Sequence, residues 1–161
     1  MLSIAERLVL LKETAVFHDL TPEELADIAV ALREVSYEPE TMIIHQGDPG
    51  DFLGIVTSGT VNVFKEDGRG GSFFLRTISP GEVVGDVALL GHVPRTATIR
   101  AASAVTMVLL DKDPFEDLMG KHAHMRRTLS RVLTMRMEGW AAAAAAQLRS
   151  AAGIRPPTPR L

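Results

Sequence analysis

Short apolar runs separated by turn residues extend from residue 42 to residue 110, and this pattern constrains the fold more than any other feature of the sequence. The segments between the runs are rich in glycine, proline, aspartate and serine, which favour turns. Short strands at such spacing are typical of a β-sandwich or a β-barrel. The runs lie at residues 42–44, 52–56, 61–64, 73–78, 96–99 and 105–110.

The residues before this region have a helical pattern. Apolar side chains at helical spacing predict a first helix over residues 3–14. A second helix begins after Thr21, which suits the N-cap position because Pro22 follows at the first helical position and Glu24 completes a capping box. This pair of helices is predicted to be mainly a scaffold for the β-region.

Helical periodicity returns after the last apolar run. Asp113 and Pro114 predict a helix start, with Glu116 at the capping-box position. Gly120 marks a joint, and a long helix is predicted from about residue 121 to residue 152.

The long helix carries one apolar stripe and an alanine run. Six consecutive alanines at 141–146 favour helix strongly, and Gly153 and Pro156 end it, so that residues 153–161 are predicted to be a flexible tail. The stripe consists of Met125, Leu129, Leu133, Met137 and Trp140.

Composition narrows the range of functions. The chain has 161 residues, 46% of them hydrophobic, and a net charge of −3, as expected of one globular domain without a basic surface for nucleic acid. It contains no cysteine, which excludes disulfides, thiolate metal sites and a cysteine nucleophile. Charges interrupt the first 13 residues and no apolar run approaches 18 residues, so we expect a cytoplasmic protein that has no signal peptide and does not bind membranes.

Residues 81–101 have the composition of an anion site. Gly85 precedes a short apolar segment at 86–90, and a glycine before a short helix allows a ligand to approach backbone N–H groups that have no intrahelical acceptor. Arg95 follows, and its planar guanidinium matches two phosphate oxygens at once.

This stretch resembles the phosphate-binding cassette of the cyclic nucleotide-binding domain family, the type found in catabolite activator protein and in protein kinase A regulatory subunits. The family pattern is Gly-Glu-x-Ala-Leu, a spacer, and Arg-(Ser/Thr/Ala)-Ala-(Thr/Ser). Here residues 85–89 read Gly-Asp-Val-Ala-Leu and residues 95–98 read Arg-Thr-Ala-Thr. Three further segments match the family pattern, namely Gln-Gly-Asp-Pro-Gly-Asp at 46–51, Ser-Gly at 58–59 and Pro-Gly-Glu at 80–82. The resemblance covers roughly residues 5–140.

The resemblance implies an α+β fold, in which an eight-stranded antiparallel β jelly roll carries N-terminal helices and a long C-terminal helix. We accordingly divide the chain into an N-terminal helical segment at 1–33, a β-roll at 34–111 that contains the cassette at 81–101, hinge and lid helices at 112–152, and the tail at 153–161.

The resemblance also implies roles for the cassette residues. Arg95 pairs with the cyclic phosphate, the N–H groups of Ala88 and Ala97 donate to the same oxygens, and Gly85 allows the sugar to lie against the chain. Asp86 stands where the family has a glutamate that accepts from the ribose 2′-hydroxyl. The implied ligand-binding set is Gly85, Asp86, Val87, Ala88, Leu89, Arg95, Thr96 and Ala97.

Two cassette positions bear on affinity and on the choice of base. The shorter side chain of Asp86 leaves a ribose contact that is either stretched or bridged by water. Complete loss of a charged hydrogen bond costs about 1.5–3 kcal/mol, so weaker binding is expected rather than none. In the family, a threonine at the position of Thr96 accompanies guanine recognition, but a structural threonine on a half-exposed strand edge is an equally good explanation of Thr96. Both cAMP and cGMP are therefore candidate ligands, with cAMP ranked first as the commoner one.

In the family, the C-terminal helix swings over the pocket and presents one side chain to the purine. The lid candidates are Leu133, Met137 and Trp140, with Arg136 as a cation–π alternative. The apolar stripe is equally consistent with packing in the core or with a homodimer seam over residues 125–150.

Other chemistry has little support in the sequence. His122 and His124 are two residues apart on a helix and face different directions. His92 in the cassette spacer has two interpretations, a residue near the ligand's phosphate or a solvated loop residue, and the second is preferred. No metal site, no cofactor and no enzymatic activity is expected. A helix-turn-helix needs roughly 60–70 further residues, so DNA binding by this chain is not expected. The prediction is a regulatory cyclic nucleotide sensor acting on an unknown partner or fused effector, and the alternative is a non-binding β-roll that serves assembly.

Overall fold

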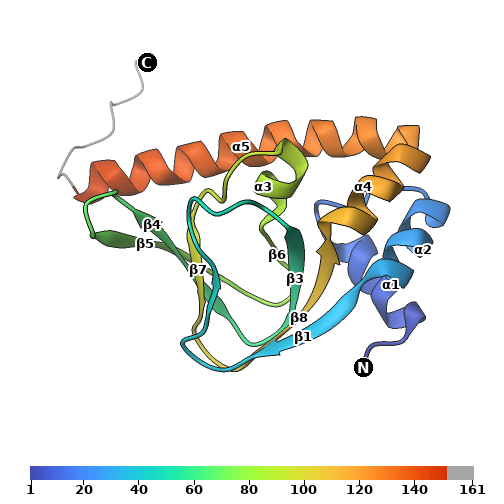
Figure 1. The fold of residues 1–161 in the computed structure, drawn as a ribbon, viewed down its shortest axis with the longest axis horizontal. Helices are drawn as coiled ribbons and strands as arrows, with labels where there is room; N and C mark the ends of the chain where they lie inside the picture. The colour runs from blue at the N-terminus through green and yellow to red at the C-terminus, as the bar shows by residue number, and fades with distance from the viewer. Residues whose placement is uncertain (152–161) are drawn as a thin grey trace, which may run out of the picture.

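The computed structural model describes the backbone of residues 1–151 and the side chains of residues 1–139 and 142. Two N-terminal helices precede the strands, a short helix interrupts them, and two helices follow (Figure 1). The predicted tail at 153–161 lies outside the described residues. The helices are α1 (Ile4–Glu13), α2 (Pro22–Ala31), α3 (Asp86–Gly91), α4 (Lys112–Lys121) and α5 (Ala123–Ala151). The strands are β1 (Arg33–Tyr37), β2 (Met42–Ile44), β3 (Phe52–Ser58), β4 (Val61–Glu66), β5 (Ser72–Ile78), β6 (Val83–Val84), β7 (Thr98–Ala101) and β8 (Val105–Asp111).

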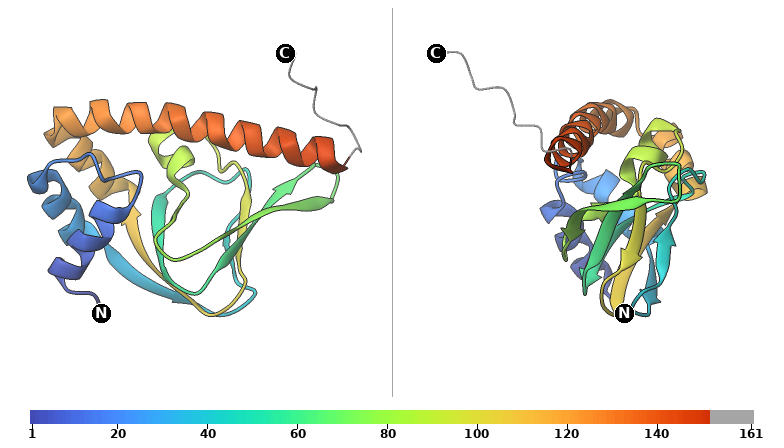
Figure 2. Two further views of the ribbon diagram at one scale, coloured as in Figure 1. Left: turned by 180° about the vertical axis from the view of Figure 1, so that it is seen from behind. Right: turned by 90° about the vertical axis from the view of Figure 1, so that its left-hand side faces the viewer.

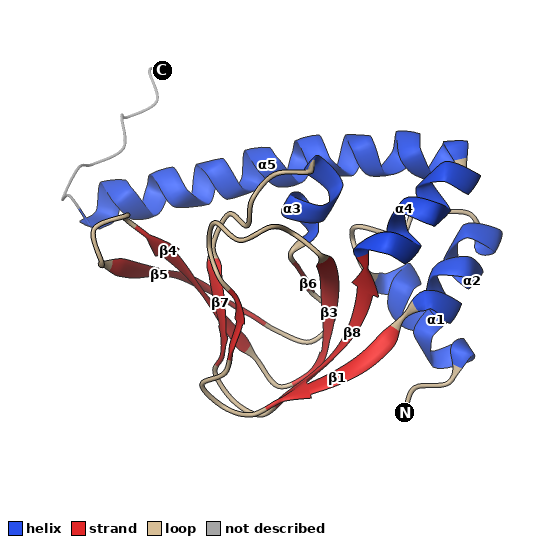
Figure 3. Cartoon of the chain, viewed as in Figure 1, coloured by secondary structure: helices blue, strands red, loops and turns tan. Residues whose placement is uncertain are grey.

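The strands form two four-stranded antiparallel sheets, in the orders β1-β8-β3-β6 and β2-β7-β4-β5 (Figure 3). The eight-stranded antiparallel roll is therefore confirmed. The apolar runs did not indicate β1 or β6, because β1 is mostly polar and β6 has only two residues. The predicted run at 96–99 begins two residues early, since β7 starts at Thr98 and the preceding residues belong to the cassette.

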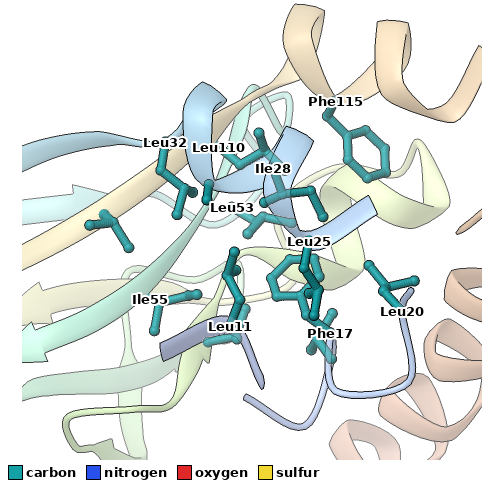
Figure 4. Close-up of a cluster of buried hydrophobic side chains, with 14 of the residues drawn as sticks. Leu11, Phe17, Leu20, Leu25, Ile28, Leu32, Leu53, Ile55, Leu110 and Phe115 are labelled. Atoms are coloured by element: carbon teal, nitrogen blue, oxygen red, sulfur yellow. The ribbon is translucent and has the colours of Figure 1, made fainter. Parts of the chain in front are cut away.

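The two central strands of the sheet β1-β8-β3-β6, β8 and β3, are buried on both faces. In β3, Leu53 and Ile55 contact the helices, while Val56 faces the second sheet. In β8, Val108 and Leu110 likewise face the helices and their neighbours face the roll. Figure 4 shows the helical side of this core, where α1, α2 and α4 contribute apolar side chains. These two strands have continuous apolar sequences because each face of the sheet has its own hydrophobic cluster.

The sequence predicted the start of α2 correctly, but not the start of α4. In α2 the Thr21 hydroxyl accepts from the Glu24 N–H and the Glu24 carboxylate accepts from the Thr21 N–H, so the predicted capping box is confirmed. The predicted start of α4 at Asp113 is wrong, because the helix begins at Lys112 with Asp111 as N-cap and no side-chain cap. Pro114 is tolerated in the first turn, where its missing N–H would have no intrahelical acceptor.

The joint predicted at Gly120, before the long C-terminal helix, lies two residues later in the structure. His122, rather than Gly120, separates α4 from α5, with extended backbone angles of φ −118° and ψ 99°. From there α5 runs across the whole molecule, from the N-terminal helices over α3 to the β4–β5 hairpin (Figures 1 and 2). No helix in the described part of the chain combines the length and the hydrophobicity that a membrane crossing needs.

Within the described part of the apolar stripe of α5, burial decreases along the helix. Met125 and Leu129 are fully buried in the helical core, Leu133 is half-buried, and Met137 is 47% exposed. The side chain of Trp140 lies outside the described residues. The first part of the stripe is thus core.

Two histidines at the α4–α5 break bind the carboxylates of α2. His124 Nδ1 lies 2.8 Å from Glu24 Oε1, and His122 Nε2 lies 2.8 Å from Asp27 Oδ2. Burial raises the pKa of Glu24, but hydrogen bonds from Thr21 and His124 outweigh it, so the pKa lies below the ordinary 4.5. The two histidines point to different partners, as their spacing predicts, and they tie the start of α5 to α2.

We expect Glu24→Gln to lower the free energy of unfolding at pH 7 by about 1–3 kcal/mol, because a buried charged acceptor loses its hydrogen bonds. Because the pKa of Glu24 is lowered, its stabilisation is present above about pH 4.5 and is lost as the pH falls through the folded-state pKa. Urea unfolding of both proteins between pH 3 and pH 7 measures this. Exposed Glu23→Gln in the same helical turn is the control and should change stability by less than about 0.5 kcal/mol; equal effects of the two substitutions would contradict the assignment.

Candidate functional site

The cassette begins where β6 ends and α3 starts. Gly85 is the N-cap of α3 and has a left-handed backbone with φ 76°. Its carbonyl oxygen accepts a hydrogen bond of 3.0 Å from Arg95 Nη1. A Cβ atom at Gly85 would lie only 2.4 Å from that nitrogen. Glycine is therefore required here by both the backbone conformation and the close approach of the guanidinium.

The Arg95 side chain is 3% exposed, although it carries a full charge. Its Nη2 atom lies 3.3 Å from Asp51 Oδ1, and its guanidinium stacks 4.7 Å from the centre of the Phe52 ring. Burial lowers the pKa of Arg95, while Asp51 and the more distant Asp48 and Asp86 oppose that shift. The site is thus a buried cation whose direct carboxylate partner, Asp51, is 76% exposed.

The loop before β3 holds the backbone of Arg95. The Arg95 N–H donates to the Asp48 carbonyl over 2.8 Å, and the Arg95 carbonyl accepts from the Gly47 N–H over 2.9 Å. Asp51 was not predicted as a partner of Arg95. The sequence did contain a signal for this pairing, because Asp51 belongs to the family motif at residues 46–51. Gly47 and Asp48 of the same motif hold the backbone of Arg95.

A small cavity of about 20 Å³ lies between α3 and the strands. This is room for roughly one water molecule, whereas small-molecule pockets usually measure about 300–1,000 Å³. Two strand residues, Ile44 and Ile99, were not among the predicted site residues; both point inward from short apolar runs. The lining residues are Ile44, Gly85, Asp86, Val87, Ala88, Arg95, Thr96, Ala97 and Ile99.

Seven of the eight residues of the implied ligand-binding set therefore surround one cavity. The exception is Leu89, which is 2% exposed and packs in the helical core beneath α3. An α-helix turns about 100° per residue, so consecutive side chains of α3 point in different directions and one of them must face the core.

The end of the cassette is tied to β4. Lys65 Nζ donates to the Thr96 carbonyl over 2.7 Å, and Thr98 Oγ1 donates to Glu66 Oε1 over 2.8 Å. Ala97 is buried between them, while the side chain of Thr96 is half-buried at the cavity. The segment that follows Arg95 and leads into β7 is thus held against β4 by these hydrogen bonds.

Asp86 is 1% exposed, and its carboxylate is paired with Arg136 of α5. Arg136 Nε lies 2.6 Å from Asp86 Oδ2, and Arg136 Nη2 lies 3.4 Å from Oδ1. Leu133, one turn earlier, lies beside Gly91 at the end of α3. Of the lid candidates, Arg136 and Leu133 contact the cassette, Met137 is largely exposed, and Trp140 has no described side chain.

His92 does not lie at the cassette cavity. It is exposed, caps α3 with φ 51°, and lines a separate hollow together with Pro49, Gly50 and Lys112. No cluster of three or more metal-ligating side chains occurs among the described residues.

Comparison with known proteins shows the family of the domain. Residues 34–122 match the model of the cyclic nucleotide-binding domain. The chain is 37% identical over 110 residues to the cAMP-dependent protein kinase regulatory subunit of Yarrowia lipolytica, a match to 68% of this chain and 28% of that subunit. It is 36% identical over 119 residues to the subunit of the same name in Colletotrichum orbiculare, a match to 73% of this chain and 30% of that protein.

Among solved structures, the chain is similar to the regulatory domain of Toxoplasma gondii PKA in co-crystals with cAMP. The TM-score is 0.70 at 25% identity, covering 82% of this chain and 50% of that one. The β-roll with its buried cassette arginine and covering helix is that of a cyclic nucleotide-binding domain, and the chain belongs to this family. It spans less than a third of the length of the curated relatives it matches.

We expect Gly85→Ala to destabilise the fold by more than Gly81→Ala. Both glycines have positive φ, 76° and 91°, so alanine costs about 1–2 kcal/mol at either position. Only at Gly85 does the new Cβ meet a neighbour, the guanidinium of Arg95; at Gly81 no atom lies within 4 Å. Displacing that charged hydrogen bond adds about 1.5–3 kcal/mol. Thermal and urea unfolding of both variants measures the difference, and equal losses would show that Gly85 is needed only for its backbone angle.

Proposed function

We propose that the chain is a regulatory module that binds a cyclic nucleotide, with cAMP as the first candidate, between α3, Arg95 and the inward faces of β2 and β7. Binding is coupled to movement of α5, and this movement controls a partner protein or a fused effector domain. The role is regulatory, and no catalytic step is proposed.

The buried guanidinium of Arg95 is the observation that carries the proposal. A charged group excluded from water is costly unless it is paired, and the contact with exposed Asp51 at 3.3 Å is a weak compensation. A cyclic phosphate brings one negative charge and two exocyclic oxygens, which match the two Nη donors of Arg95. The carbonyl of Gly85 and the carboxylate of Asp51 hold these donors in place for the anion.

Other cavity residues complete the ligand's surroundings. The first N–H groups of α3 have no intrahelical acceptor and lie at the cavity with Val87 and Ala88. Asp86 lines the cavity beside Val87, and its carboxylate supplies an acceptor for a sugar hydroxyl. Ile44 and Ile99 provide an apolar surface on the strand side. The site combines an anion pocket, a hydroxyl acceptor and an apolar wall, which are the three chemical parts of a nucleotide.

The size of the cavity supports the coupling to α5. A cyclic nucleotide does not fit in about 20 Å³, so the pocket has to open for binding. Arg136 and Leu133 of α5 contact α3 directly. A ligand that moves α3 on entering therefore acts on α5 as well, and a different affinity for two positions of α5 would produce the population shift that a regulatory module requires.

Isothermal titration calorimetry with cAMP tests the proposal. A ligand of about 22 heavy atoms at roughly −0.3 to −0.4 kcal/mol per atom predicts roughly micromolar affinity. Arg95→Ala should weaken binding at least about 100-fold, because two charged hydrogen bonds are lost. Arg69→Ala, in the exposed β4–β5 turn, is the control and should bind as the wild type does. No binding by the wild-type chain at millimolar nucleotide would contradict the proposal and favour the alternative, a non-binding roll that serves assembly.

Thr96 tests the identity of the base. Its side chain lines the cavity, and its hydroxyl is a donor and acceptor for the exocyclic amine of guanine. We expect Thr96→Ala to leave cAMP affinity within about twofold and to weaken cGMP by roughly 3- to 10-fold, the worth of a neutral hydrogen bond. Parallel titrations with both nucleotides give the two ratios. An equal loss for both would instead assign Thr96 to the strand structure.

A further inference from the structure

The segment around the joint between α4 and α5 carries positive charge without any acid. Residues 118–137 contain no aspartate or glutamate, although the chain as a whole has a net charge of −3. The lysine and arginine residues of this segment are Lys121, Arg126, Arg127, Arg131 and Arg136. The segment is therefore a local exception on an acidic protein, and each of its charges needs an explanation.

The fold explains three of these charges. Lys121 Nζ lies 3.1 Å from a carboxylate oxygen of α2. The guanidinium of Arg136 pairs with the buried carboxylate at the start of α3. Arg126 Nη1 donates to backbone carbonyls in the last turn of α4, where the helix dipole favours a cation. Each of the three thus contributes to packing one element against another.

Arg127 and Arg131 remain without a partner. Both are exposed, and neither side chain forms a hydrogen bond or an ion pair with another residue that the structure describes. They lie one helical turn apart on α5, so their Cβ atoms are about 5–6 Å from each other. Like charges at this spacing slightly destabilise a helix. This pair of charges therefore does not serve the stability of α5.

The two free arginines lie on the outer side of α5. Together with Arg126 and Ser130 they line one open hollow on the surface. Figure 2 shows α5 along the edge of the molecule, with no other element of the described chain over its outer side. Met135 follows one turn after Arg131 in the same line and is 72% exposed. The surface thus presents two free guanidinium groups followed by an apolar side chain.

The size and composition of this surface indicate the kind of partner. Four residues of helix span about 6 Å, so the two guanidinium groups match two carboxylates one turn apart on another helix. Arginine and methionine are both enriched in protein–protein interfaces, whereas lysine is depleted there. Anionic membranes are bound by clusters of about four to eight basic residues, and nucleic acids by broad positive surfaces. The surface therefore fits an acidic protein segment best.

We propose that Arg127, Arg131 and Met135 form a docking surface for an acidic helical segment of a partner protein. Two carboxylates of that segment, at positions i and i+4, pair with the two arginines. An apolar side chain one turn further packs on Met135, whose flexible thioether adapts to different shapes. The inference goes beyond the proposed function, because docking on this surface does not require the nucleotide pocket.

Fluorescence anisotropy with a labelled peptide tests the docking surface. The probe is an alanine-based helical peptide with two glutamates one turn apart and a leucine in the following turn. The matched probe has glutamine in place of both glutamates. At low salt the chain should bind the glutamate peptide at least about tenfold tighter, because only carboxylates form charged pairs with arginine. Equal affinities for the two peptides would overturn the proposal.

A pair of double variants locates the binding surface. Arg127→Glu/Arg131→Glu should weaken binding of the glutamate peptide by about tenfold or more, because two attractive pairs become repulsive. Lys12→Glu/Arg69→Glu is the control, since it changes the net charge equally at two exposed positions on other elements. It should leave the affinity within about threefold. Equal losses would show that net charge alone attracts the peptide and would refute the assignment to this surface.

Other occupants are separated with the same variants. If phosphatidylserine vesicles or a short DNA duplex bind the wild-type chain more tightly than the glutamate peptide does, and Arg127→Glu/Arg131→Glu abolishes that binding, the partner is not an acidic protein segment. Sedimentation velocity at the same salt concentration tests a second copy of the chain. A dimer that disappears in this double variant would equally overturn the proposal, because the surface would then be occupied by the chain itself.

Thermal unfolding without peptide or nucleotide tests whether the arginines serve the fold instead. Arg127→Glu replaces a like-charge pair by a favourable i,i+4 pair with Arg131, so the melting temperature should rise by roughly 1–4 °C. A fall of the same size would assign the two arginines to the stability of α5 and overturn the inference. Because no nucleotide enters these experiments, their outcome is independent of whether the chain binds one.

Discussion

The burial of the Arg95 guanidinium is the constraint on which the rest of the site depends. Its charge is held by the Gly85 carbonyl, the Asp51 carboxylate and the Phe52 ring, which reach it from β6 and from the start of β3. Glycine at position 85 is needed for this approach, and the loop before β3 holds the arginine backbone through Asp48. A buried cation with one exposed carboxylate partner is a costly arrangement, and its natural compensation is an anion.

The roll keeps this site in place because one sheet is packed on both faces. β3 and β8 bury alternate side chains against the helices and against the second sheet, so their positions are determined from two sides. The cassette lies where the strands are interrupted by α3, and α3 is in contact with both the sheet and α5. A change at α3 is thereby passed to α5 rather than absorbed by the sheet, whose packing leaves little freedom.

The two buried charges of the cassette are held by different parts of the molecule. Arg95 is held by elements of the roll itself, whereas Asp86 is held by α5. The first arrangement prepares an anion site within a rigid framework. The second ties the covering helix to a residue that lines the cavity. The tie from His122 and His124 to α2 keeps the start of α5 attached, so movement is expected towards its other end.

Much of the fold followed from local sequence, because the turn-separated runs predict strands and residues Thr21 to Glu24 predict a helix start within single elements. The cassette was implied by the resemblance of residues 85–98 to a family pattern, and seven of its eight implied residues line one cavity. Tertiary structure decided the rest. The pairing of Arg95 with Asp51 joins residues 44 positions apart, and the pairing of Asp86 with Arg136 joins residues 50 positions apart. The burial of Leu89 depends on which face of α3 the core covers. Such contacts leave no periodic signal, since they are set by how the roll and α5 pack.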